Sequence, residues 1–175
     1  MTTMTFDPAA LPDLGPVPDL APVSRDRVAA RLDARGYNYG IDDDGDIGGR
    51  WDDHVFFFLL MGSKKEYLQV RGRWARTLPA SELGQVLVAA NEWASSRIWP
   101  KIYVNVEDGN LGIYAEHAVD YEYGVTDGQL DLHLGCAIST SLAFFEALDA
   151  RYPQEVAAAK AEIARLTEQS GEQQG

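Results

Sequence analysis

Residues 55–61 read VFFFLLM, seven consecutive apolar side chains. The stretch is too short for a typical helix and is rich in phenylalanine, which favours a β-strand. An antiparallel strand with one face in water normally alternates apolar and polar side chains. Because this one does not, we expect both of its faces to be covered. Helices cover one face, and the other is covered by a further helix, a second subunit or a bound segment.

Four more strands are predicted from alternation and turn residues. Residues 46–53 predict a short strand weakened by glycine, and residues 66–75 alternate clearly between the two faces. Residues 101–106 and 111–115 flank the turn EDGN and predict a hairpin.

Three helices are predicted around these strands. The first follows Ser24, a favourable N-cap, and ends at Gly36. The second follows Pro79 and is stopped by Pro100, and the third opens at Thr126 with a capping-box pattern. The order helix, three strands, helix, two strands, helix predicts an α+β fold with an antiparallel sheet of about five strands.

The charge and cysteine content limit the classes of partner. The 175 residues carry a net charge of −12, so the phosphate field of nucleic acid or an anionic membrane would repel the chain. No apolar run is long enough to span a membrane. The single cysteine, Cys136, excludes an intramolecular disulfide and indicates the cytoplasm.

Composition divides the chain into three parts. Residues 1–22 hold five of the eight prolines, which predicts a disordered leader. We favour a passive tail there over a strap that binds a partner. Residues 23–152 form the predicted domain, and residues 153–175 are a polar, alanine-rich tail, either helical or disordered.

The acidic loop DDDGD, residues 42–46, raises the question of a calcium site. No register of an EF-hand loop fits, because the residue at the twelfth position is never a glutamate. We therefore favour a solvated acidic turn at a sheet edge. Weak cation binding by the clustered carboxylates Asp42 to Asp46 is the alternative.

Motifs for catalysis are absent from the sequence. His54, His117 and His133 lie in different predicted elements, and Cys136 lies in a helix among apolar neighbours. No phosphate-binding loop or dinucleotide fingerprint is present. The sequence predicts no catalytic residue, no metal site, no cofactor and no enzymatic activity.

One local concentration of positive charge stands out. Five of the fifteen basic residues fall on one predicted hairpin, and Arg71 and Arg73 share a strand face. We favour charge balance against the aspartates of the preceding strand over an anion site or a partner site.

Several short segments, taken in order, resemble the YbjN-domain family of bacterial proteins. These are GRWDD, VRGRW, NEWASSRIWPKIYV and the final helix with DGQL and FFEAL, which together span about residues 24–152. The resemblance implies the fold shared with type III secretion chaperones. The family is described as sensory-transduction regulators without established enzymatic activity, so there are no catalytic residues to carry over. The related chaperones are small acidic homodimers that hold extended segments of partner proteins.

Together these observations predict a cytoplasmic, non-enzymatic domain that binds protein, as a regulator or a chaperone-like adaptor. The alternative is a ligand- or cation-binding domain that uses the acidic loop. An excess of apolar surface further predicts a homodimer. We expect Trp93, Trp99 and Tyr103 at or near its interface, and Arg71 and Arg73 on the same partner surface.

Overall fold

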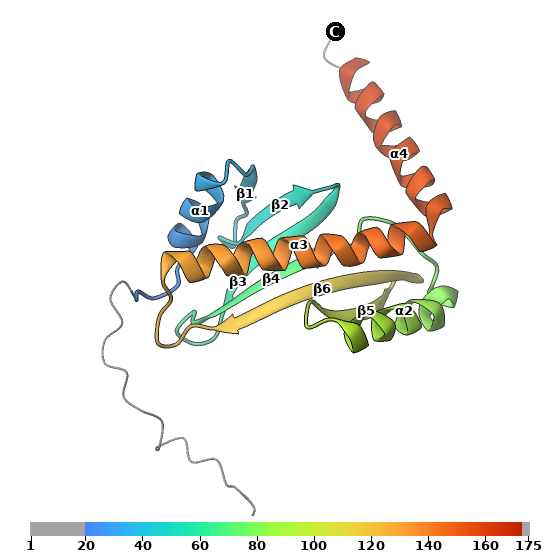
Figure 1. Ribbon diagram of the computed structural model, residues 1–175. Coiled ribbons are helices and arrows are strands. Elements are labelled where there is room, and N and C mark those ends of the chain that lie inside the picture. Colours follow the sequence, from blue (N-terminus) through green and yellow to red (C-terminus); the bar gives the residue numbers. More distant parts are fainter. Residues whose placement is uncertain (1–19, 173–175) are drawn as a thin grey trace, which may run out of the picture.

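The computed structural model describes residues 20–172 and contains four α-helices and six β-strands in this part of the chain (Figure 1). Their order confirms the predicted α+β class. In chain order the elements are α1 (Arg25–Ala34), β1 (Tyr39–Ile41), β2 (Ile47–Trp51), β3 (His54–Met61), β4 (Tyr67–Arg73), α2 (Leu83–Ser96), β5 (Lys101–Glu107), β6 (Asn110–Asp120), α3 (Asp127–Arg151) and α4 (Pro153–Glu172).

The strands form one antiparallel sheet in the order β1-β2-β3-β4-β6-β5. The sheet therefore has six strands where about five were predicted. The additional strand, β1, is only three residues long and pairs with β2 across the acidic loop. Such a short segment carries no alternation that a sequence could reveal.

The apolar strand β3 separates two different environments. Its residues His54, Phe56 and Phe58 are buried, whereas Phe57 and Leu59 on the opposite side are only half-buried. All three helices α1, α2 and α3 lie on the buried side, with α3 running across the sheet (Figure 1). These three helices cover one face only, which leaves a second subunit or a bound segment as the covers expected for the other face.

Helix α3 begins where the sequence predicts. The Thr126 side chain accepts from the Gln129 N–H at 3.1 Å, and the Gln129 side chain accepts in return from the Thr126 N–H. This pair satisfies two backbone donors that the first turn would otherwise leave free. The helix then buries a long apolar stripe against β4 and β6.

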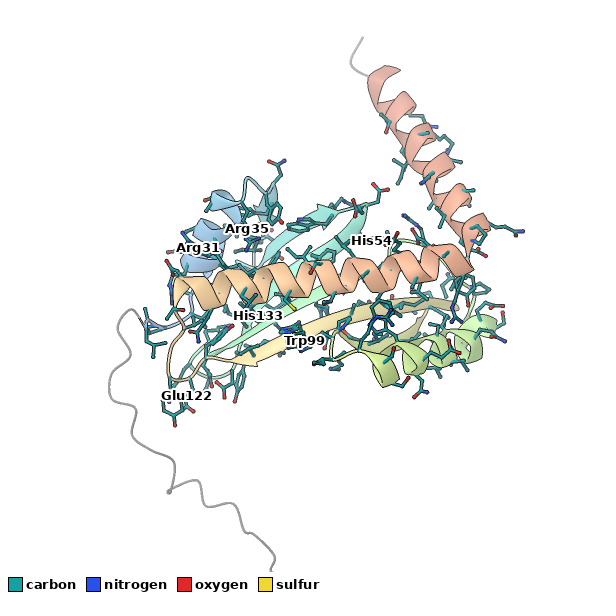
Figure 2. The ribbon with its side chains drawn as sticks, in the orientation of Figure 1. Arg31, Arg35, His54, Trp99, Glu122 and His133 are labelled. Carbon is teal, nitrogen blue, oxygen red and sulfur yellow. The ribbon has the colours of Figure 1, made fainter. Side chains whose placement is uncertain are left out.

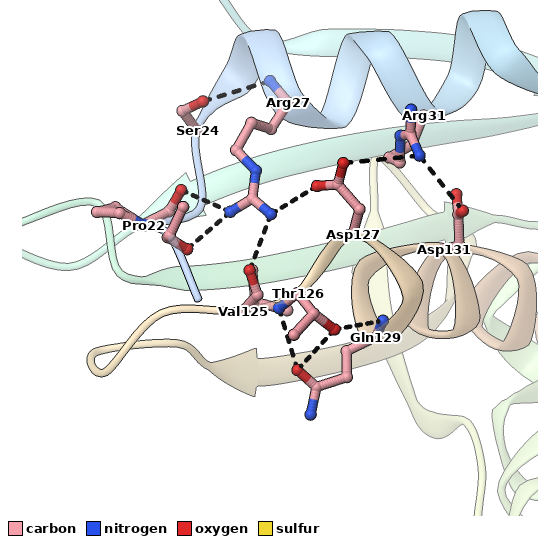
Figure 3. A network of polar contacts seen from close by, with 10 residues as sticks. Pro22, Ser24, Arg27, Arg31, Val125, Thr126, Asp127, Gln129 and Asp131 are labelled. Carbon is pink, nitrogen blue, oxygen red and sulfur yellow. Dashed lines mark hydrogen bonds and ion pairs between the residues drawn. The ribbon is translucent and has the colours of Figure 1, made fainter. Parts of the chain in front are cut away.

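An arginine network joins the start of the domain to the start of α3 (Figure 3). Arg27 donates to the carbonyls of Ala21, Pro22 and Val125 and forms an ion pair with Asp127 at 2.6 Å. Ala21 also bridges Val125 in a short antiparallel pairing. The domain contacts thus include two residues that the predicted leader, 1–22, contained; residues 1–19 lie outside the described part.

The remaining boundaries differ slightly from expectation. Pro79 bridges Asn110, and a 3₁₀ turn at Ala80–Glu82 precedes α2, so the second helix starts at Leu83 rather than directly after the proline.

The tail is helical as α4, which projects beyond the end of the sheet (Figure 1). None of the helices that the structure describes is long and apolar enough to cross a membrane.

Candidate functional site

The five residues predicted for a partner surface lie on two surfaces. Arg71 and Arg73 on β4 and Tyr103 on β5 share the side of the sheet away from the helices. Trp93 and Trp99 lie on the helix side, at the end of α2 and in the segment after it. A single flat interface therefore cannot contain all five residues.

We call the side of the sheet away from α1, α2 and α3 the open face. Its apolar part is the outward side of β3, formed by Val55, Phe57, Leu59 and Met61. Met61 is 48% exposed, and the other three are half-buried by neighbours within the sheet. The open face therefore offers a continuous apolar strip that no described helix covers.

Beside this strip lies a cluster of aromatic and charged side chains. Tyr103 stacks on Tyr114 across the β5–β6 pair, with ring centres 4.9 Å apart and planes 11° apart. Arg73 forms an ion pair with Glu107 at 2.8 Å and donates to the Tyr114 hydroxyl. A Cβ on Gly112 would lie 2.3 Å from the Glu107 carboxylate, so a larger residue there would make the Glu107 side chain shift.

The pKa values in the cluster show how strongly its members are paired. Burial, followed by the hydrogen bond to Glu116, raises the pKa of Tyr103 to about 12. The hydrogen bond from Tyr114 and then that from Arg73 lower the pKa of the Glu107 carboxyl. Each charge is thus held by a partner within the same face.

The acidic residues that neutralise the basic hairpin are not the ones predicted. Arg73 is neutralised by Glu107 on β5, and Lys64 pairs with Glu122 after β6 at 3.4 Å. Within residues 20–172 neither has an ion pair with the aspartates of the preceding strand. The reason is strand order: β4 lies between β3 and β6, so its outward side chains also reach the β5–β6 hairpin.

The second surface is a groove between α2 and α3, which we call the helix groove. Its volume is about 720 Å³, and its lining is mostly apolar. Figure 2 shows Trp99 beside the middle of α3, on the side toward α2. The residues that line the groove are Trp93, Arg97, Ile98, Trp99, Ser139, Thr140, Ala143, Glu146, Ala147 and Ala150.

Two tryptophans and an arginine form one wall of the helix groove. Trp93 is 9% exposed and donates its indole N–H to the Trp99 carbonyl at 3.0 Å. The Arg97 guanidinium lies 3.9 Å from the centre of the Trp93 ring. Trp99 and Ile98 are 44% and 85% exposed, so this wall presents apolar surface to solvent.

The opposite wall was missed at the sequence level, although it left a signal. Ala143, Ala147 and Ala150 recur at helical spacing along α3, and their small side chains leave room between the two helices. The spacing is visible in the sequence. That it faces α2, however, depends on how the helices pack.

Two histidines lie buried behind Trp99. The His117 and His133 ring centres are 4.5 Å apart, and that of His117 is 4.7 Å from Trp99. His133 is hydrogen bonded to the Tyr121 hydroxyl at 2.9 Å, whereas neither nitrogen of His117 has a hydrogen-bond partner among residues 20–172. Burial lowers the pKa of both and brings that of His133 to about 4, so both rings are neutral near pH 7.

The third histidine belongs to a separate polar cluster at the other end of α3. His54 accepts the Ala75 N–H at 3.0 Å, and burial, followed by nearby Arg76, lowers its pKa to about 4. Asp149 accepts from the Trp74 indole at 2.7 Å and from Arg76 at 3.1 Å. This cluster ties β4 and the segment after it to the end of α3.

The acidic loop is a hydrogen-bonded turn. One oxygen of Asp42 accepts the backbone N–H groups of Asp44 at 3.1 Å and Asp46 at 2.9 Å. Arg25 and Lys65 border the same pocket and supply positive charge. No three side chains of the metal-binding types gather within residues 20–172.

Comparisons with known proteins identify the fold. The crystal structure of YbjN from E. coli superposes with a TM-score of 0.61 at 15% identity, covering 75% of this chain and 96% of that one. The HopA1–SchA chaperone–effector complex matches at 0.47, with 13% identity over 71% of this chain and 99% of that one. The Yersinia pestis type III secretion chaperone SycH matches at 0.42, with 11% identity over 69% and 98%. Because the TM-scores of the last two matches are below 0.5, we draw no conclusion about partners from them.

Sequence comparison places the chain in a family. No curated protein matches it by sequence. The profile of the YbjN family, described as "Putative bacterial sensory transduction regulator", matches residues 24–150, which is most of the chain and nearly the span expected from its motifs. The chain therefore belongs to the YbjN family.

Proposed function

We propose that this chain is a non-enzymatic protein-binding domain, a regulator or adaptor, and that it binds a second copy of itself through the open face. The observation that carries the proposal is the uncovered apolar strip of β3. A sheet that buries apolar side chains on both faces normally has a layer on each. The described helices supply only one.

The area of the open face is adequate for a dimer. Six strands about 4.8 Å apart, with a mean length of about seven residues at about 3.4 Å per residue, give a face of roughly 600 Å². Two such faces in contact bury roughly 1,200 Å², the lower end of the range for stable interfaces. Two sheets can pack in this way about 10 Å apart.

Charge favours a second copy at this place. The chain carries −12 overall, so two copies repel wherever acidic surfaces meet. The open face has four basic and three acidic side chains, and it is close to neutral. A self-complementary contact there brings two copies together with little repulsion.

Non-enzymatic action is supported by the separation of the reactive groups. His54 is the first residue of β3, while His117 and His133 are buried behind Trp99. Burial raises the pKa of the Cys136 thiol, which disfavours the nucleophilic thiolate. In the part of the chain that the structure describes, neither the helix groove nor the cavity beside His54 combines these groups into a nucleophile with its base. The single cysteine further supports a cytoplasmic location.

The dimer is tested with two substitutions of matched exposure. Met61 on the open face is 48% exposed and Leu87 on α2 is 49% exposed, so neither change disturbs the core. Met61→Glu places an unpaired charge in the apolar strip and should weaken association in sedimentation equilibrium, because burying it is costly, whereas Leu87→Glu should leave association unchanged. Equal dissociation constants for the two variants would exclude the open face as the interface.

A further inference from the structure

We infer that the cavity beside His54 binds a lysine- or arginine-containing segment of a partner protein. Arg76 and His54 hold a backbone carbonyl of that segment, and carboxylates at the rim of the cavity hold its basic side chains. The site rests on the proposed protein-binding function and gives the partner a chemistry. It lies on the helix side of the sheet, apart from the open face that pairs with a second copy.

The cavity lies where the β2–β3 turn meets α3 and α4. Its volume is about 650 Å³, within the range of about 300–1,000 Å³ that is typical of ligand sites. The turn residues 52–53, Glu146 on α3 and Lys160 on α4 reach it from three sides. Figure 2 shows His54 beside α3, in the half of that helix nearer α4.

His54 supplies a hydrogen-bond donor that lacks an acceptor. The residue is only 3% exposed, and its Nδ1 accepts the Ala75 N–H at 3.0 Å. Burial, followed by nearby Arg76, lowers its pKa to about 4, so the ring is neutral near pH 7 and carries its one proton on Nε2. No group of residues 20–172 accepts a hydrogen bond from this Nε2.

Arg76 supplies further donors of the same kind. Its side chain is 4% exposed, and Nη2 donates to Asp149 at 3.1 Å. Its Nε and Nη1 have no hydrogen-bond partner in the described part of the chain. Leaving buried donors unpaired is costly, and most buried polar groups in proteins have a partner. Two adjoining residues with unpaired donors in one cavity therefore point to an oxygen acceptor supplied by a ligand.

The charges around the cavity indicate that this acceptor is neutral. The positive charge of Arg76 is balanced by Asp149. The other charged residues that line the cavity are the two turn aspartates, Glu146 and Lys160, three carboxylates against one ammonium group. A phosphate or a carboxylate would meet net repulsion there, whereas a ligand with positive charge would be attracted.

A basic peptide segment meets both requirements at once. The peptide carbonyl is a strong, uncharged acceptor, and a lysine or arginine side chain brings positive charge close to it. A polyamine has the charge without the acceptor, a sugar has acceptors without the charge, and a nucleotide has acceptors with the opposite charge. The net charge of −12 on the whole chain also favours the approach of a basic segment.

Isothermal titration calorimetry of the full chain with acetylated and amidated tetralysine tests the rim. Asp52→Asn combined with Asp53→Asn should weaken binding about fivefold, because two rim charges are lost. Asparagine tolerates the positive φ of both positions, as aspartate does. Asp43→Asn combined with Asp44→Asn makes the same charge change in the acidic loop and should leave the dissociation constant unchanged. Equal weakening by the two pairs would overturn the inference, because net charge alone would then attract the peptide.

Spermine tests the acceptor, since it carries a comparable positive charge and no carbonyl. The unmodified chain should bind tetralysine more tightly than spermine. Arg76→Lys keeps a positive charge beside Asp149, removes Nε and Nη1, and should reduce this difference. Equal affinity for the two probes, or no binding of tetralysine, would overturn the inference, and neither result requires the Arg76 variant to fold. Sedimentation of the unmodified chain decides the dimer separately from all of these titrations.

Discussion

All three histidines of this chain are buried on the helix side of the sheet, and their rings are neutral near pH 7. His54 and His133 each have a hydrogen-bond partner, whereas neither nitrogen of His117 has one in the described part of the chain. Burial is the largest cause of the lowered pKa in each case. In the unfolded chain the same side chains return to a pKa of about 6.5.

The sign of the pH effect follows from this difference. Below pH 6.5 the unfolded chain binds protons that the folded chain excludes, so the free energy of unfolding should fall as the pH drops from 6.5 toward 4. His117→Leu removes one of these groups without removing a hydrogen bond. Urea unfolding should show equal or higher stability of the variant at pH 7, by up to about 1 kcal/mol, and a smaller loss on acidification. A less stable variant with an undiminished acid loss would contradict this account.

At the scale of elements, the close approach of α3 to β4 depends on one glycine. A Cβ on Gly72 would lie 2.7 Å from the ring of Phe56 and 3.1 Å from the ring of Phe145 on α3. Gly40 on β1 has open space at the same position. The two glycines therefore form a matched pair for testing how tightly the helix packs on the sheet.

We expect Gly72→Ala to destabilise the fold by about 1–3 kcal/mol, because overpacking forces the rings or the helix to shift. Gly40→Ala should be neutral or slightly stabilising, since it restricts the unfolded chain and meets no obstacle. Thermal and urea unfolding of the two variants measure the difference. If both had the stability of the unmodified chain, α3 would pack less closely on β4 than described.

Local patterns explain how much the sequence could predict about these elements. A continuous apolar run located β3, alternation located β4 and the β5–β6 hairpin, and the capping box located the start of α3 at Thr126. Strand β1 was not predicted, because three residues beside an acidic loop are too few to show alternation of apolar and polar side chains. The residues predicted for a single partner surface lie on two surfaces for a different reason. Tyr103 pairs with Tyr114 on the open face, while Trp99 lies on the helix side. That choice of face is set by packing of the whole sheet.

For the whole molecule, the layers explain why this chain should bind protein. Helices cover one face of a six-stranded sheet, and the other face carries the apolar strip of β3 beside a cluster of paired charges. The fold matches YbjN from E. coli over 96% of that chain, and the family match ends at residue 150, before α4. The open face and the helix groove lie within the domain, whereas the leader and the tail are additions to it.

Light scattering of the unmodified chain at micromolar concentration, behind a size-exclusion column, tests the central claim most directly. If the open face pairs with a second copy, the measured mass should be twice 19.3 kDa and should decrease on dilution. A mass of 19.3 kDa that does not change over the accessible concentration range would contradict the proposed dimer. The apolar strip of β3 would then face solvent in the isolated chain.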